Sequence, residues 1–481
     1  MPDKLISAVR HQKTNKEFDL MMKKTLALGI IIAFMALTPV PAFATGSGGY
    51  ENASFSAKQL ALGGTGTATP DEAAAISYNP AGIADLPGVQ VQADANFISL
   101  MTFKDNDQTG STRSSGTLAL VPTGYVTVNP GKMFCDKLAL GVGMDSPFGL
   151  MNKYNSNDPA VHYTGWRNEL KMYAIKPTIA YKVTDKISVG GGPVYYRIDD
   201  FGSIQGYPNS LIVGGLPDGQ MRANMSGNRW GWQLGTLLKL TPKHRLGYYV
   251  RGPVVVKARG QVKVEGASTL WGPSDFETGV HTKVNLPMNM TWAYAFQPTE
   301  KTHYEADFTW THWSVHKRLR VPADPAPGVW NNTILDGVGN SSGSDKDWRD
   351  GYGLQLGASH KLTKNLTLRG GSWFYWTPIP KDHFTPAVPD ANHLALSMGA
   401  GYNINKYLVL DLCYYNSFYF RRRINNSIAE NPSLSNSSVD GTYTTYSQGF
   451  TISLTLKWDD LFPRVGGKVD EGPSIEMPKV A

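Results

Sequence analysis

Alternation of apolar and polar residues, repeated along most of the chain between short turns, is the pattern that most constrains this sequence. From Phe450 to Trp458 every second residue is apolar, and the residues between them are Thr, Ser, Thr and Lys. Because successive side chains of a β-strand point to opposite faces, such a strand has one apolar and one polar face. A soluble sandwich strand has the same pattern, but here it recurs about fourteen times, with tight turns on one side and long polar loops on the other. This organisation indicates an outer-membrane β-barrel.

Two kinds of connection join the predicted strands. Six are short and carry the Gly, Pro, Asn and Asp residues of tight reversals: 129–132, 184–186, 241–243, 297–300, 363–365 and 403–406. Seven are longer and rich in Ser, Asn, Gly, Pro and Asp: 105–116, 147–170, 201–228, 265–281, 322–348, 381–391 and 425–442. Thirteen connections predict an all-β fold, a transmembrane antiparallel β-barrel of fourteen strands. The strand number is even, as in bacterial single-chain barrels.

The N-terminus has the features of an export signal. Lys23 and Lys24 precede an apolar stretch from Leu26 to Leu37, and Ala42-Phe43-Ala44 fits an A-x-A cleavage site, so we assign residues 1–44 to a signal peptide. The polar residues 1–20 are either an unusually long n-region or the result of a start codon placed too early. Removing residues 1–44 deletes six Lys/Arg and three Asp/Glu, and the formal charge falls from +7 to +4. This mild excess does not suggest nucleic-acid binding.

The mature chain reads as one large domain with additions at both ends. We assign residues 88–458 to the barrel and residues 459–481 to a periplasmic C-terminal tail. A fourteen-stranded barrel has a lumen too wide for its own side chains to fill, so the chain needs a plug or forms an open pore. Residues 45–87 are rich in Ala and Gly and lack strand alternation. We interpret them as an N-terminal hatch inside the lumen, with a short helix at Thr69–Ile76; a flexible periplasmic tail is the alternative.

Cys135 and Cys413 are the only cysteines. An even number in an exported protein allows a disulfide, but two unpaired thiols is the interpretation we favour. The sequence contains no C-x-x-C motif and no His/Cys cluster, so we expect neither a metal nor a cofactor.

Strand parity selects candidate residues facing the lumen. Transport of an amphiphile needs an apolar tunnel and a few polar groups that hold its head. Leu366 and Leu368 point to lipid, so Arg369 points inward. The same argument places Asp411, Glu305 and Asp307 inward.

In the strand that starts at Gly247, Arg251 and Lys257 share one parity, although Pro253 between them would shift it at a bulge. Lumen charges either pair with one another and hold the hatch or bind a carboxylate head group. We select Arg251 and Lys257 as head-group ligands.

Six blocks, in order along the chain, resemble the FadL-type family of outer-membrane long-chain fatty-acid transporters, which also includes aromatic-hydrocarbon channels. They are DEAAAISYNPAG at Asp71–Gly82, DSPFG at Asp145–Gly149 with Trp166-Arg167, GYYVRGPV at Gly247–Val254, FTWTHWS at Phe308–Ser314, Asp347–Pro380 and Thr385–Tyr402. Two features depart from the family pattern. Gly252 replaces the Ser of the Y-R-S-P strand, and residues follow the final aromatic Trp458.

The resemblance implies a fourteen-stranded barrel with an N-terminal hatch. It also implies capture of hydrophobic substrates at extracellular loops, passage through the lumen, and exit through the barrel wall or past a rearranged hatch. Within it, Asn79, Pro80 and Ala81 are the predicted gate: Asn79 can bond backbone groups of a neighbouring strand, Pro80 fixes the chain direction, and Ala81 allows close packing. Arg167 in the capture loop and an apolar landing site at Phe148, Leu150 and Met151 complete the candidate list.

The function we expect is passive uptake of long-chain fatty acids by a monomer in the bacterial outer membrane. Aromatic hydrocarbons are the alternative substrate, and a nonspecific porin or structural barrel is the alternative class. Expected partners are the substrates, outer-membrane lipid and lipopolysaccharide, and the outer-membrane assembly machinery. We expect no enzymatic activity. His393 and Ser397 share a strand face, but about 13–14 Å separates their backbones at the usual strand rise.

Overall fold

The computed structural model describes residues 48–52, 55–105, 111–131, 135–158, 161–207, 209, 216–266, 275–322, 346–425 and 439–459. The predicted signal peptide 1–44 lies outside the described residues, as does the tail 459–481 except for Asp459. No helix of the described chain is long and apolar enough to cross a membrane.

The described part of the chain contains nineteen strands in a single sheet. Their bounds are β1 (Val89–Asp105), β2 (Thr112–Arg113), β3 (Thr117–Val128), β4 (Leu138–Asp145), β5 (Leu150–Lys153), β6 (Arg167–Lys182), β7 (Ile187–Tyr207), β8 (Gly219–Lys239), β9 (His244–Arg251), β10 (Val254–Glu265), β11 (Phe276–Leu286), β12 (Asn289–Phe296), β13 (Thr302–Thr311), β14 (Gly351–Lys361), β15 (Leu366–Trp376), β16 (His393–Asn403), β17 (Leu408–Tyr419), β18 (Arg422–Ile424) and β19 (Gly441–Trp458). Several are pieces of one longer strand, namely β4 with β5, β9 with β10, β11 with β12, and β17 with β18, and β2 is a two-residue segment.

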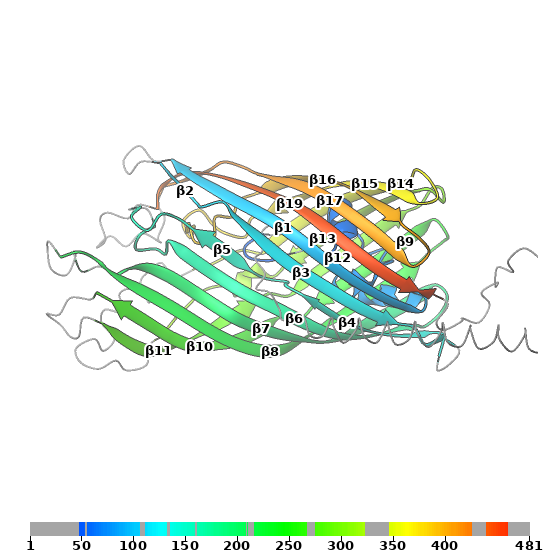
Figure 1. The fold of residues 1–481 in the computed structure, drawn as a ribbon, viewed down its shortest axis with the longest axis horizontal. Helices are drawn as coiled ribbons and strands as arrows, with labels where there is room; N and C mark the ends of the chain where they lie inside the picture. Colours follow the sequence, from blue (N-terminus) through cyan, green and yellow to red (C-terminus); the bar gives the residue numbers. More distant parts are fainter. Residues whose placement is uncertain are drawn as a thin grey trace, which may run out of the picture.

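The sheet closes on itself as an antiparallel barrel of fourteen strands, as predicted (Figure 1). The first and last strands pair from Val89↔Trp458 to Asp105↔Thr442, and β1 pairs with β3 on its other side. Five of the predicted short turns lie between described strands as expected, for example between β6 and β7 and between β14 and β15. The predicted turn 129–132 lies partly outside the described residues. The predicted loop 201–228 is shorter than expected, since β7 continues to Tyr207 and β8 begins at Gly219.

The two faces of the barrel wall follow the predicted parity. In β19, Phe450 and Leu454 are 41% and 46% exposed on the outside, whereas Thr451 and Ser453 are buried. The polar face is buried because the lumen is occupied. The Ser453 hydroxyl, for instance, accepts a hydrogen bond of 2.7 Å from the backbone N–H of Ala57.

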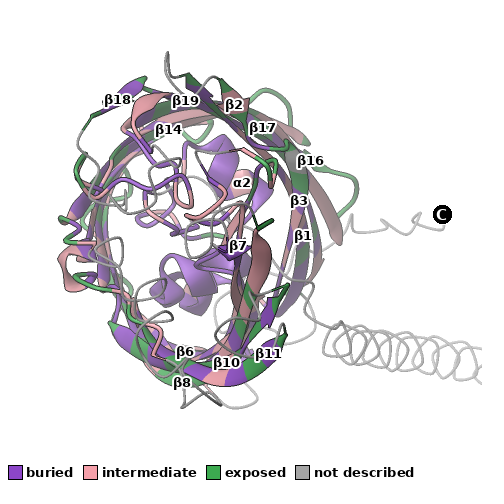
Figure 2. Ribbon diagram, turned by 90° about the vertical axis from the view of Figure 1, so that its left-hand side faces the viewer, coloured by how far each residue is buried: buried purple, intermediate pink, exposed green. Residues whose placement is uncertain are grey.

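The occupant is the N-terminal segment before β1, and Figure 2 shows its helices enclosed by the ring of strands. It contains α2 (Ala57–Ala61) and the 3-10 helices η1 (Ala73–Ser77) and η2 (Pro80–Asp85). The helix expected at Thr69–Ile76 is the shorter η1, whose alanines are fully buried. A further 3-10 helix, η5 (Trp313–Val315), follows β13. We call residues 48–52 and 55–87 the hatch.

Two interruptions of the wall matter for the site. The strand β9–β10 breaks at Gly252-Pro253, where proline has no backbone N–H for the ladder. The strand β4–β5 breaks at residues 146–149, within the D-S-P-F-G block 145–149. The described ladder between β3 and β4 runs only from Val128↔Leu140 to Gly124↔Met144, and β5 pairs with β6. From Thr123 back to the start of β3, the described strands therefore form no continuous ladder between β3 and the β4–β5 strand.

Candidate functional site: the hatch–wall contact in the lumen

The start of the hatch is seated against the β4–β5 break. Glu51 and Phe148 form an isolated antiparallel bridge. The N–H of Asn52 donates to the carbonyl of Pro147 at 2.9 Å, and the N–H of Gly149 donates to the carbonyl of Tyr50 at 3.0 Å. Backbone hydrogen bonds thus join the hatch to the wall at the break between β4 and β5.

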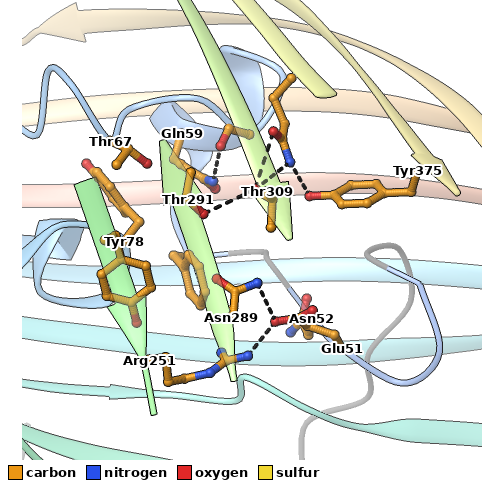
Figure 3. A pocket seen from close by; sticks show the side chains of 14 residues that line it. Glu51, Asn52, Gln59, Thr67, Tyr78, Arg251, Asn289, Thr291, Thr309 and Tyr375 are labelled. Carbon is orange, nitrogen blue, oxygen red and sulfur yellow. Dashed lines mark hydrogen bonds and ion pairs between the residues drawn. The ribbon is translucent and has the colours of Figure 1, made fainter. Parts of the chain in front are cut away.

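Arg251 lies at the end of β9 and is 2% exposed. Its guanidinium forms an ion pair with the Glu51 carboxylate, and its planar group lies 4.5 Å from the centre of the Phe148 ring. Glu51 also accepts a hydrogen bond from Asn289 Nδ2 at 3.3 Å (Figure 3). Thr311 Oγ1 donates a further hydrogen bond of 3.0 Å to Glu51. A desolvated guanidinium on an aromatic face, already holding a carboxylate, is chemically a carboxylate-binding site.

An aromatic cluster adjoins this ion pair. The Tyr50 ring lies 4.7 Å from Trp313 and 5.6 Å from Trp348, and 6.1 Å from Phe148. His316 packs on Trp348 with ring centres 4.7 Å apart. Burial, together with the charge of Lys346, lowers the pKa of His316 to about 3, so this ring is neutral at neutral pH. The cluster is therefore an aromatic, largely apolar environment beside the Arg251 guanidinium.

A small polar cavity separates the middle of the hatch from β9, β12, β13, β14 and β15. Its volume is about 50 Å³, and its lining includes Glu51, Gln59, Arg251, Asn289 and Gln355 (Figure 3). Within the described residues, Gln59 Oε1 and Arg251 Nε have no hydrogen-bond partner. A volume of this size and polarity accommodates one or two water molecules, not an acyl chain.

Asn79 fastens the middle of the hatch to the wall. Its Oδ1 caps η2 by accepting from the N–H of Ala81 at 3.2 Å, and its Nδ2 donates to the carbonyls of Thr67 at 2.6 Å and Thr236 at 3.1 Å. Pro80 occupies the first position of η2, where its fixed φ and missing N–H cost nothing. Two wall glycines leave room, because a Cβ on Gly235 would lie 2.1 Å from Asn79 Oδ1 and a Cβ on Gly190 would lie 2.6 Å from Pro80.

Wall carboxylates hold the hatch backbone. Glu305 accepts from the N–H groups of Gly66 at 3.1 Å and Ala68 at 2.6 Å, and Asp307 accepts from the N–H of Thr67 at 3.3 Å. The inward parity predicted for both residues is confirmed. Their role in this closed arrangement is to hold the hatch.

Two ion-pair groups complete the attachment. Lys176 and Asp145 form a fully buried pair at 2.5 Å, and the Ser77 hydroxyl of the hatch donates to the same carboxylate. Toward the turn ends of the barrel, Asp85 lies 2.7 Å from Lys182 and 2.5 Å from Lys239. Burial raises the pKa of Asp85, but hydrogen bonds and charge from the two lysines outweigh it and hold this pKa below its ordinary value.

Comparison with known proteins identifies the family. Residues 40–458 match the family described as outer membrane protein transport protein (OMPP1/FadL/TodX). The chain belongs to this FadL/TodX family. It is accordingly a transport protein of the bacterial outer membrane, as the sequence predicted.

Individual relatives of this FadL/TodX protein agree with the assignment. It is 27% identical over 406 residues to the long-chain fatty acid transport protein of Escherichia coli O6:H1, covering 76% of this chain and 86% of the relative. It is 25% identical over 395 residues to the protein of the same name from Salmonella typhi, with 76% and 86% covered.

Solved structures share the fold. A Pseudomonas aeruginosa FadL homologue matches with a TM-score of 0.71 at 19% identity, covering 86% of this chain and 99% of that one. The Pseudomonas putida toluene transporter TodX matches with a TM-score of 0.60 at 17% identity, covering 84% and 98%.

The structure brings some of the predicted binding residues together and separates others. Arg251 and Phe148 are in contact, and Leu150, at the start of β5, packs against the same aromatic cluster. Arg167 lies at the start of β6 and is ion-paired with Glu169. Arg369 points inward as predicted and pairs with Asp411 at 2.5 Å.

The inward placement predicted for Lys257 is wrong. Val254, Val256 and Ala258 of β10 are buried, and Lys257 is exposed on the outer surface of the barrel. The break at Gly252-Pro253 adds one residue between Arg251 and the next inward position, and a shift of one residue exchanges the two faces of a strand. The proline was the signal for this shift.

Sequence reasoning missed Glu51, Tyr50, Trp313 and Trp348, because their contacts join segments far apart in the chain. It also assigned no role to His393 and Ser397 beyond rejecting a catalytic pair. The His393 ring stacks on Tyr419 with centres 4.4 Å apart, and Ser397 Oγ accepts from the N–H of the hatch residue Gly63 at 3.2 Å. Among the described residues, Cys135 and Cys413 are free and no group of three His, Cys, Asp or Glu side chains could hold a metal.

Proposed function

We propose that this protein is a passive uptake channel for hydrophobic molecules, with long-chain fatty acids as the principal substrates. The observation that carries the proposal is the buried Arg251, placed on the Phe148 ring and neutralised by Glu51, a residue of the hatch rather than of the wall. The fatty-acid transport proteins named above are relatives of this chain and support the same substrate class.

The geometry supports an exchange of carboxylates. A fatty acid entering this site brings a carboxylate that can replace Glu51 on Arg251, while its chain replaces Tyr50 against the tryptophans. A charge-assisted hydrogen bond contributes about 1.5–3 kcal/mol, and the exchange keeps it. Because Tyr50 and Glu51 are adjacent in the chain, one substrate displaces both at once.

Displacement of the hatch follows from the size of the cavity. Since about 50 Å³ cannot hold an acyl chain, the segment around Glu51 must leave its place before a substrate passes. We assign Asn79, Pro80 and Ala81 to the gate because they fix the middle of the hatch to β7 and β8.

The route out of the lumen is proposed to pass through the wall. The support is the interrupted ladder between β3 and the β4–β5 strand, which lies where the backbone of residues 50–52 is bonded to residues 147–149. Loss of the hatch bonds would release a part of the wall where the ladder between β3 and its neighbour is interrupted. Exit past a rearranged hatch is the other route.

One observation favours a second substrate class. The cluster of Tyr50, Phe148, Trp313 and Trp348 would hold an uncharged aromatic ring without any need for Arg251. Aromatic hydrocarbons are therefore the alternative substrates, and the toluene transporter TodX shares the fold.

Paired uptake measurements distinguish these functions. Cells or proteoliposomes carrying the protein should show saturable uptake of oleate, without added energy, exceeding that of toluene. Saturable toluene uptake without oleate uptake would reverse the ranking. A nonspecific porin would instead conduct small ions equally with and without residues 45–87.

A further inference from the structure

A group of basic residues lies on the outer surface of the barrel, away from the lumen. Lys257 and Arg259 of β10 and His281 and Lys283 of β11 are all exposed. In the ladder, Lys257 is directly opposite Lys283, and Arg259 is directly opposite His281. We call these four residues the outer cationic patch. Opposed residues have Cβ atoms about 4.5–5.5 Å apart, so the patch is compact.

Within the part of the chain that the structure describes, the outer cationic patch has no acidic partner of its own. Among the described residues, no acidic side chain lies within ion-pair distance of Lys257, Arg259 or Lys283, whereas the next cation on the same face, Lys263, is paired with Glu265 at 2.6 Å. Like charges directly opposite in a ladder destabilise it. An external anion between Lys257 and Lys283 would relieve this repulsion.

The position of the patch along the membrane normal indicates which anion it would meet. Immediately toward the membrane, the outer face consists of Val255 on β10, 45% exposed, and Trp230 and Trp232 on β8, 58% and 43% exposed. Exposed tryptophans mark the boundary between hydrocarbon and head groups. Beyond Val255, every outward residue of β10 is polar, and β10 and β11 run side by side toward the loop end of the barrel (Figure 1). Lys257, the next outward residue after Val255, thus begins the patch at the edge of the apolar surface, at the level of the head groups of the outer leaflet.

We propose that the outer cationic patch binds the phosphate groups of lipid A, the phosphorylated glycolipid of that leaflet. Lys257 and Lys283 hold one phosphate between them, Arg259 extends the site along β10, and the acyl chains lie over Val255 and the two tryptophans. The site is on the lipid-facing side and is independent of substrate transport through the lumen.

The test measures binding of lipid A to the full-length mature protein in detergent containing EDTA. The triple variant Lys257→Gln/Arg259→Gln/Lys283→Gln should bind bisphosphorylated lipid A more weakly, by about five-fold for each cation removed. Lys263→Gln, on the same strand face but paired with Glu265, is the matched control and should bind like the wild type.

A second measurement compares the melting temperatures of the wild type and Lys283→Gln, first without and then with lipid A. Without lipid A, Lys283→Gln should melt at the same temperature as the wild type or higher, because it removes a like-charge contact. With lipid A, the wild type should gain more thermal stability than Lys283→Gln, and dephosphorylated lipid A should stabilise neither. Equal stabilisation by both glycolipids, or undiminished binding by the triple variant, would overturn the proposal. Equal stabilisation of the wild type by phosphatidylglycerol would overturn the assignment to lipid A.

Discussion

Glu51 and Arg251 form a buried ion pair between the hatch and the barrel wall, and the guanidinium also covers the Phe148 ring at 4.5 Å. The cation is part of the fixed wall, and its partner belongs to the segment that blocks the lumen. An anionic amphiphile and the docked hatch would therefore compete for one guanidinium, since the carboxylate of Glu51 already occupies it. This relationship makes the transport proposal testable at single residues.

Neutralising Arg251 should separate acids from esters. In Arg251→Gln, affinity for oleate should fall roughly 5- to 150-fold, the equivalent of about 1–3 kcal/mol for one charge-assisted contact, while methyl oleate should change little. Tryptophan-fluorescence titration with both ligands, with melting followed in parallel, measures the difference. Arg369→Gln, which breaks the pair with Asp411, is the control and should not discriminate between the ligands. An equal loss for acid and ester in Arg251→Gln would refute head-group binding.

Removing the charge of Glu51, which competes with the substrate for Arg251, should raise the affinity for oleate. Glu51→Gln leaves Arg251 without its counter-charge and weakens the hatch contact, by about 3–5 kcal/mol in comparable buried pairs. Oleate affinity should rise, and rise more than that of methyl oleate, because only the acid restores the missing charge. The same titration measures it, and unchanged or weaker oleate binding would contradict the exchange.

Asn79 should be required for gating but not for barrel assembly. Asn79→Leu removes the two bonds from Nδ2 and places a larger side chain against Gly235, so the hatch cannot dock in its present position. Oleate uptake should decrease several-fold, while the heat-dependent shift in gel mobility that reports a folded barrel should persist. Normal uptake by this variant would exclude Asn79 from the gate.

The attachment of the hatch at Asp85 should weaken in acid. Its pKa is lower in the folded protein than the value of about 3.9 expected in an unfolded chain. The stabilisation is therefore complete above pH 3.9 and is lost as the pH falls through the folded pKa, where Asp85 takes up a proton and releases Lys182 and Lys239.

Protection of the η2 backbone amides from hydrogen exchange, taken relative to the intrinsic exchange rate at each pH, should fall over that acidic interval in the wild type. In Asp85→Asn, this protection should already be low at neutral pH and change less on acidification. Wild-type protection that matched the variant's at neutral pH would show that this attachment does not hold the hatch.

Parity reasoning succeeded wherever a strand was unbroken. Glu305 and Asp307 on β13, Arg369 on β15 and Asp411 on β17 all face inward, because the alternation of side chains is a property of local backbone geometry. It failed at Lys257, where the Gly252-Pro253 break shifts β10 by one residue. The same correction that removed Lys257 from the lumen placed it in the outer cationic patch.

The sequence by itself determined the strand pattern, the turn positions, the strand number and the family. These depend on alternation and turn chemistry, which act over a few residues. Only the tertiary structure decided that Glu51 neutralises Arg251, two hundred positions away, and that Tyr50 meets Trp313 and Trp348. Such contacts depend on how the hatch is seated in the closed barrel. No local pattern encodes that placement, since it results from closure of β1 on β19 and from the packing of the hatch against wall glycines and carboxylates.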